Sequence, residues 1–257
     1  ITQNDSGTPK YFILTENTAR YLSPQAGGTE TQIPFVLQTN IPNASNINGE
    51  ALLYGINSTD FSSNGDTIEF QATGSTSGRW RKNAGSYTNI ATLALDQALG
   101  SNGLRLALGA ISGFTNGHTW IWARQAPPPY AGTHPQWAVT ASPYKRDLYL
   151  AGLDRTIMRL RGDFITSVGY RRVYGRFAEV FYNHLVVGQY APSGYNSGAV
   201  IDSYDQAVTP WRLGWSDLND PDEFFATDIN EADTYDIPSN NAAMDGIDPG
   251  ITGMSKW

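Results

Sequence analysis

The sequence has no cysteine, few charged residues and no long apolar run. Without cysteine there is no disulfide, thiolate nucleophile or cysteine-ligated metal, which fits a chain matured in a reducing cytosol. No stretch approaches about 18 apolar residues and no leader pattern opens the chain, so we expect neither membrane insertion nor a signal peptide. The formal net charge of -7 should repel nucleic acid and anionic membranes at long range.

Histidine is also scarce, because the chain holds only His118, His134 and His184. A Ser-His-Asp hydrolase needs a nucleophile on a strained turn beside its base, and no G-x-S-x-G elbow accompanies these residues. Their spacing fits no metal site. We therefore assign the three histidines turn or surface roles, and we expect no catalytic residue, metal or cofactor.

What the sequence does have is glycine, proline and short apolar runs. The 26 glycines and 14 prolines fall in clusters between these runs, several of which alternate, as in Ile68 and Phe70 against Thr67 and Glu69. Alternation with period two and frequent turns predicts antiparallel strands. We therefore predict an all-β protein with a β-sandwich-like domain over residues 1–126.

Three consecutive prolines, Pro127 to Pro129, predict a domain boundary, because they cannot donate backbone hydrogen bonds and hold an extended conformation. We place a linker at residues 127–136 and propeller-like blades at residues 137–257, where strands follow one another at hairpin spacing. A closed propeller needs at least four blades of about 40–50 residues. We therefore expect either a partial propeller or a fragment of a longer one, incomplete at its C-terminal end.

Charge is segregated in this second half. Eight basic and three acidic residues lie between Lys145 and Arg176, whereas one basic and ten acidic residues follow from Ser216 onward. The basic run predicts a patch that contacts either the acidic end of a neighbouring copy or DNA phosphates, and symmetric rings favour the first. Its residues are Arg155, Arg159, Arg161, Arg171, Arg172 and Arg176.

The chain is organised around the stretch from Thr209 to Phe225, TPWRLGWSDLNDPDEFF. It predicts a strand followed at once by a tight polar turn. Four carboxylates lie in this turn, namely Asp217, Asp220, Asp222 and Glu223, and two of them could serve a glycosidase. Asp, Asn and Pro are also what a tight turn uses, and we favour the turn. The structural signature consists of Trp211, Trp215, Ser216, Asp217, Asn219, Asp220 and Pro221.

This order of strand, W-S-D-L-N-D-P turn and aromatic re-entry resembles a blade signature in propeller-type tail proteins of tailed bacteriophages, the packaged-DNA-stabilising or tail-nozzle proteins. With RDLYLAGLDRTIMRLRG and FAEVFYNHLVVG, the resemblance covers about residues 137–257, and more weakly 87–123. It implies a non-enzymatic, ring-forming virion subunit below the portal that helps retain packaged DNA and forms the ejection passage.

The resemblance also implies partners and a location. The partners would be copies of the chain in a ring, other virion tail or portal proteins and, without sequence specificity, genomic DNA. The protein would be assembled in the host cytoplasm and reside in the virion tail. The alternative is a phage fibre or adhesin module that binds host-surface glycans through exposed aromatic residues such as Trp80, Tyr144 or Tyr195.

Overall fold

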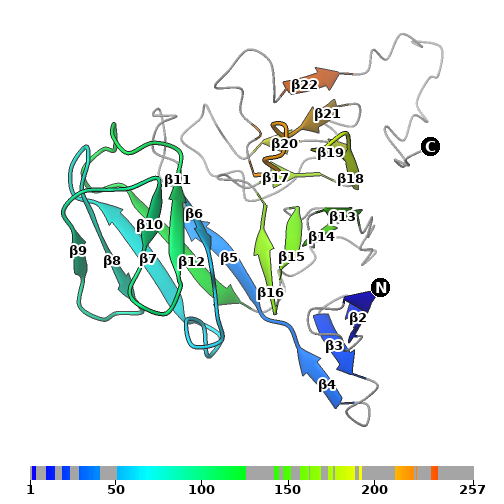
Figure 1. The fold of residues 1–257 in the computed structure, drawn as a ribbon, viewed down its shortest axis with the longest axis horizontal. Helices are drawn as coiled ribbons and strands as arrows, with labels where there is room; N and C mark the ends of the chain where they lie inside the picture. The colour runs from blue at the N-terminus through cyan, green and yellow to red at the C-terminus, as the bar shows by residue number, and fades with distance from the viewer. Residues whose placement is uncertain are drawn as a thin grey trace, which may run out of the picture.

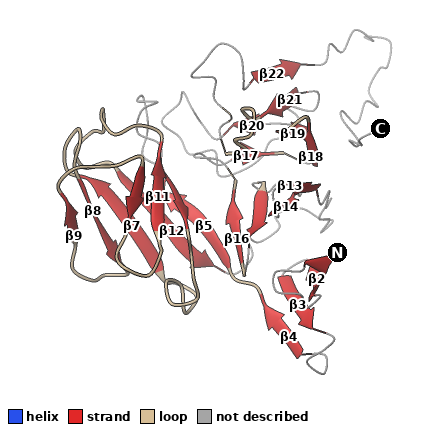
Figure 2. Ribbon diagram, viewed as in Figure 1, coloured by secondary structure: helices blue, strands red, loops and turns tan. Residues whose placement is uncertain are grey.

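The chain folds into β-strands in the computed structural model. The residues that the structure describes are 2–3, 10–14, 19–23, 29–40, 51–125, 142–144, 147–151, 157–161, 163–168, 173–175, 177–188, 191–192, 212–222, 224 and 233–236. No helix occurs among these residues (Figure 2), so the prediction of an all-β protein is confirmed. The described part accordingly holds no helix that could cross a membrane.

Two sheets pack face to face in the first half of the chain and form a sandwich (Figure 1). The larger layer contains β5 (Phe35–Asn40), β12 (Thr119–Gln125), β7 (Thr67–Ala72), β8 (Gly78–Lys82) and β9 (Thr88–Ile90). The smaller layer contains β10 (Asp96–Ala98), β11 (Arg105–Leu108) and β6 (Ala51–Tyr54). The predicted sandwich is therefore present.

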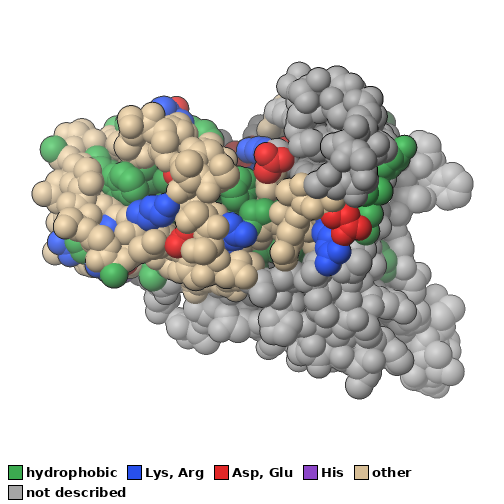
Figure 3. Space-filling model, turned by 90° about the horizontal axis from the view of Figure 1, so that it is seen from below, with side chains coloured by type: hydrophobic (Ala, Val, Ile, Leu, Met, Phe, Trp, Pro, Cys, Tyr) green, Lys and Arg blue, Asp and Glu red, His purple; other side chains and the backbone are tan. Residues whose placement is uncertain are grey.

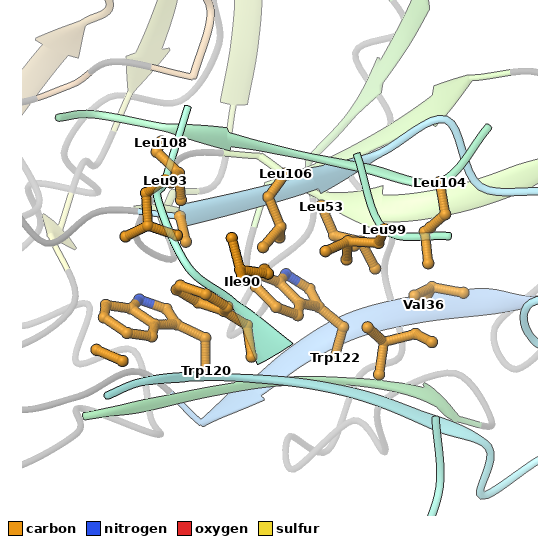
Figure 4. Packing of buried hydrophobic residues seen from close by; sticks show 14 of the residues in the cluster. Val36, Leu53, Ile90, Leu93, Leu99, Leu104, Leu106, Leu108, Trp120 and Trp122 are labelled. Carbon is orange, nitrogen blue, oxygen red and sulfur yellow. The ribbon is translucent and has the colours of Figure 1, made fainter. Parts of the chain in front are cut away.

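Alternation along the strands places the apolar side chains between these layers. Ile68 and Phe70 of β7 are buried, as expected, and Phe70 lies 5.4 Å from Trp120 between ring centroids. Figure 4 shows Trp120 from one layer and Leu106 and Leu108 from the other directed into the space between the sheets. Burying each such side chain contributes about 1.5–3 kcal/mol, so this core stabilises the sandwich as a unit.

The larger layer continues beyond the sandwich as a nine-stranded sheet. Its further strands are β13 (Ser142–Tyr144), β14 (Asp147–Leu150), β15 (Met158–Arg161) and β16 (Phe164–Ser167). The join is a parallel pairing of β16 with β5, in which Ile165 lies opposite Phe35. The predicted linker, 127–136, lies outside the described residues, so the domain division stays a prediction, but one sheet contains strands from both sides of it.

Three groups of four antiparallel strands follow one another in space, and we call them the first, middle and last meanders. The first meander has β1 (Thr2–Gln3), β2 (Lys10–Leu14), β3 (Ala19–Ser23) and β4 (Thr29–Gln32). The middle meander is β13 to β16. The last has β18 (Phe177–Phe181), β19 (His184–Gly188), β21 (Arg212–Trp215) and β22 (Asp233–Asp236), while β17 (Val173–Tyr174) pairs with β20 (Ala191–Pro192).

The middle meander carries buried apolar side chains on both faces, which explains this stacking. Leu148 and Leu150 of β14 join one core cluster with Phe12 of the first meander. Tyr149, which points to the opposite face of β14, joins another cluster with Val187 of the last meander. The middle meander therefore packs between the other two, as Figure 1 shows, and the first meander belongs to this stack and not to the sandwich.

Candidate functional site

The predicted turn after β21 is present in the structure. β21 ends at Trp215, and Asp217 and Asp220 form an isolated bridge across the turn that follows. Asn219 has a φ of 63°, a left-handed conformation that Asn tolerates better than most residues. The prediction of a tight polar turn is confirmed, whereas Trp211 lies outside the described residues.

Ser216 attaches this turn to the neighbouring strand β19. It is fully buried, and its hydroxyl accepts a hydrogen bond from the Leu185 amide at 2.9 Å and donates to the Asp217 carbonyl at 3.0 Å. Its own amide donates to the Leu185 carbonyl at 3.0 Å. The Ser216 hydroxyl thus supplies hydrogen-bond partners to a backbone amide of β19 and to a backbone carbonyl of the turn. These bonds fix where the turn begins.

The second half of the turn directs Asp222 into the interior. Its amide donates to the carboxylate of Asp220 at 3.0 Å, and Phe224 beyond it is buried in the core. Burial raises the pKa of Asp220, and the nearby Asp222 and Asp217 carboxylates raise it further. The turn therefore concentrates acidic groups at the edge of the last meander.

Asp222 forms an ion pair with Arg159 of the middle meander. The Arg159 Nη1 lies 2.6 Å from the Asp222 Oδ2, and the two side chains are only 2% and 8% exposed. Burial by itself would lower the pKa of Arg159, but Asp222 is the chief of the groups that raise it above its ordinary value. The guanidinium therefore stays charged between the two sheets and binds them together.

A second pair lies on the same face of the middle meander. Arg161 donates through Nε to both carboxylate oxygens of Asp147, at 2.8 and 3.0 Å, and through Nη2 to Oδ2. The same Oδ2 lies 3.9 Å from Nε of Arg159. Burial raises the pKa of the Tyr149 hydroxyl beside Arg159 well above its ordinary value. These side chains form one charged layer, which we define as Asp147, Tyr149, Arg159, Arg161 and Asp222.

The predicted basic patch is wrong at one position, Arg159. Arg159 is buried and paired, so its assignment to a surface that contacts DNA or another subunit is wrong. Arg161 is half-exposed at 51%, but Asp147 neutralises it. On the coloured part of Figure 3, charged side chains of both signs are scattered among other residues. The other four lie outside the described residues, namely Arg155, Arg171, Arg172 and Arg176.

The acidic partners of Arg159 and Arg161 were not predicted from the sequence. The signal for Asp147 was present, because a β14–β15 hairpin in which Tyr149 faces Arg159 brings Asp147 beside Arg161. The sequence pattern around Asp222 predicts only a turn residue or one carboxylate of a glycosidase pair. The structure instead places Asp222 in the ion pair, while the Asp217 Oδ1 accepts the Leu218 amide hydrogen bond at 2.6 Å.

The histidines that the structure describes lie beside turns. Tyr182 and Asn183, with φ of 45° and 66°, form the turn of the β18–β19 hairpin. His184 follows them, and its Nδ1 lies 2.7 Å from the Ser216 carbonyl oxygen. His118 closes the turn before β12 through its amide, while His134 is not described. The described residues contain no group of three His, Asp or Glu that could hold a metal ion.

The sequence was compared with models of protein families and with curated proteins. No family model and no curated protein matches this chain. The likeness to propeller-type tail proteins therefore stays a resemblance based on the quoted motifs.

The structure describes the side chain of one of the three aromatic residues named for the glycan-binding alternative, Trp80. Trp80 is partly buried and packs against the sandwich core, where its ring is close to the position that a Cβ on Gly100 would occupy. A side chain packed this way offers little free surface for a sugar. The side chains of Tyr144 and Tyr195 lie outside the described residues.

Proposed function

We propose that this chain is a non-enzymatic structural subunit of a tailed-phage virion. In this proposal it forms a ring with copies of itself in the tail or nozzle below the portal, contacts neighbouring tail or portal proteins, helps retain packaged DNA and contributes to the ejection passage. The proposal rests on the sequence resemblance and on one structural observation.

That observation is the stacking of three four-stranded antiparallel meanders around a middle sheet with buried apolar side chains on both faces. Propeller blades are four-stranded antiparallel sheets that pack against their neighbours in this way. In chain order the sandwich strands lie between the first and the middle meander. The arrangement supports consecutive blades with the sandwich inserted between two of them.

The charged layer supports a structural role for the motif that carries the resemblance. Asp222 comes from the stretch after the W-S-D-L-N-D-P turn, and its partner Arg159 comes from the preceding meander. Opposite charges that we expected to meet between copies meet here within one chain. Contact with DNA or with a neighbouring copy therefore depends on Arg161 and the four arginines outside the described residues.

Native mass spectrometry of the purified protein tests this proposal. We expect a closed assembly of several identical chains that shows no binding to bacterial polysaccharide in a parallel assay. A monomer that binds polysaccharide would overturn the proposal and favour the fibre or adhesin alternative.

A further inference from the structure

Asparagine followed by glycine is a chemically reactive pair, because glycine has no side chain to hinder its backbone nitrogen. The structure describes three of the four such pairs in the sequence, namely Asn64-Gly65, Asn102-Gly103 and Asn116-Gly117. The fourth, Asn48-Gly49, lies outside the described residues. Both residues of each described pair are exposed, so exposure does not distinguish the three.

The reaction of such a pair uses the backbone amide of the glycine as its nucleophile. After base removes the amide proton, the nitrogen attacks Cγ of the asparagine, and the new N–Cγ bond closes a succinimide ring as the Cγ–Nδ2 bond breaks. Nδ2 takes up a proton from water and leaves as ammonia. Water then opens the ring at either carbonyl and gives aspartate or isoaspartate. An amide proton held in a hydrogen bond is lost only when that bond opens.

Hydrogen bonds hold the glycine amide in two of the pairs. The Gly65 amide donates to the Arg124 carbonyl at 2.8 Å, and the Gly117 amide donates to the Ala72 carbonyl at 2.9 Å. Both bonds lie at the ends of the antiparallel pair β7 and β12, which are central strands of the larger layer. Release of either amide therefore requires the end of this strand pair to open.

The Gly103 amide is in a different situation. Gly103 lies in the loop between β10 and β11, which the Leu99 amide closes by donating to the Leu104 carbonyl at 2.8 Å. The Gly103 amide itself has no hydrogen-bond partner among the described residues. It can therefore lose its proton without any opening of a sheet.

One hydrogen bond holds the Asn102 side chain, because its Nδ2 donates to Oδ1 of Asp60. Ring closure breaks this bond, but Asp60 keeps the hydrogen bond that the Asn57 backbone amide donates to Oδ2 at 2.9 Å. The loop also keeps the bond from Asn57 Nδ2 to the Asn102 carbonyl at 3.0 Å. Losing one side-chain bond should slow the reaction less than opening the ends of two central strands.

We propose that Asn102 is a site of spontaneous deamidation in the folded protein, and that the reaction breaks the link between two loops. The product carries a carboxylate, which cannot donate to Asp60 as the amide does. Asp60 is only 3% exposed, so two carboxylates repel each other there with little screening by water. The loop of residues 100–103 thereby loses its side-chain attachment to Asp60. This modification is independent of the proposed role in a virion.

Peptide mapping by mass spectrometry tests the site on the whole chain, incubated folded in mildly alkaline buffer. We expect Asn102 to lose its amide at least about tenfold faster than Asn64 and Asn116. In the urea-unfolded chain, where no hydrogen bond distinguishes the pairs, all three should react at similar rates. Reaction of folded Asn64 or Asn116 as fast as Asn102 would overturn the proposal, as would an unchanged Asn102 after the unfolded chain has reacted.

Hydrogen exchange measures the first step directly, because exchange and ring closure both begin with loss of the amide proton. The Gly103 amide should exchange faster than the Gly65 and Gly117 amides. Equal protection of the three amides would contradict the physical basis of the proposal.

Variants test the consequence for the loops. Asn102→Asp reproduces the aspartate product and should unfold at a lower urea concentration than the wild type, whereas the exposed Asn116→Asp should not. Exchanging the partners, as Asp60→Asn with Asn102→Asp, restores one donor and one acceptor and should recover stability. A double variant no more stable than Asn102→Asp would show that this pair does not link the loops.

Discussion

The Arg159 guanidinium and the Asp222 carboxylate meet 2.6 Å apart between two sheets, although 63 residues separate them in the sequence. This pair joins the middle meander to the turn that carries the recognisable motif. Its partners belong to the basic run and to the acidic end of the chain. The basic run and the acidic end of the chain therefore form at least one ion pair within a single chain, which stabilises its fold.

Breaking this pair should be strongly destabilising. Asp222→Ala leaves the Arg159 charge buried without its partner, and we expect a loss of about 3–5 kcal/mol in the free energy of unfolding. Replacing both residues, as Arg159→Met with Asp222→Leu, should cost less than Asp222→Ala alone. Urea denaturation measures each value.

The exposed pair of Arg20 and Glu30 provides the control, since its side chains are 45% and 48% exposed. Glu30→Ala should change the free energy of unfolding by about 0–1 kcal/mol. If Asp222→Ala cost no more than Glu30→Ala, the buried pair would not be holding the two sheets together.

Ser216→Ala should loosen the turn. The Leu185 amide would lose its side-chain acceptor in a buried position, so we expect destabilisation of about 1–3 kcal/mol. Hydrogen exchange should also show faster exchange of the Leu185 amide. Ser112→Ala, at an exposed position, should have no effect on either quantity. Unchanged exchange at Leu185 would contradict the anchoring role of Ser216.

The sandwich core should respond to the loss of a single side chain. Leu106 is fully buried between the layers, so Leu106→Ala should cost about 2–5 kcal/mol. Leu95, at 58% exposure, offers a matched substitution, and Leu95→Ala should stay within about 0.5 kcal/mol. Equal effects in chemical denaturation would mean that the two layers do not pack as described.

Stability should fall in acid partly through Asp66. The Ser63 amide donates to its carboxylate at 2.9 Å and the Ser62 hydroxyl at 2.8 Å, and these bonds lower the pKa of Asp66 below its ordinary 3.8. As the pH falls, Asp66 is therefore protonated in the unfolded chain before it is protonated in the folded chain. Its contribution to the free energy of unfolding is complete above about pH 4 and is lost as the pH falls further.

Thermal melting between pH 2 and pH 6 tests this expectation. The midpoint of the wild type should fall below about pH 4 more steeply than that of Asp66→Asn, which has no proton to bind at this position. Parallel pH profiles for the two proteins would show that the Asp66 carboxylate makes no net contribution.

Local features of the fold could be predicted, but its long-range pairings could not. Ile68 and Phe70 alternate with polar neighbours, and Asn219 with Asp220 and Pro221 marks a turn, so both followed from nearby residues. The parallel pairing of β16 with β5 joins segments more than a hundred residues apart, and no local signal encodes it.

At the candidate site, too, local features could be predicted from the sequence and long-range contacts could not. Alternation places Arg159 and Arg161 on one face of β15, which is correct. Whether that face is solvent-exposed depends on the sheet that covers it, and the last meander arrives from a later part of the chain. Arg159 was therefore expected on a surface, where most arginines lie, and its burial became evident only with the partner Asp222.

The proposed function requires the three stacked meanders to act as consecutive blades in a ring-forming subunit. Cryo-electron microscopy of the assembled protein tests it most directly. The account predicts a closed ring in which each subunit shows three four-stranded sheets packed face to face, with the sandwich projecting from the stack. Single particles without rotational symmetry, or meanders separated from one another in the map, would contradict it.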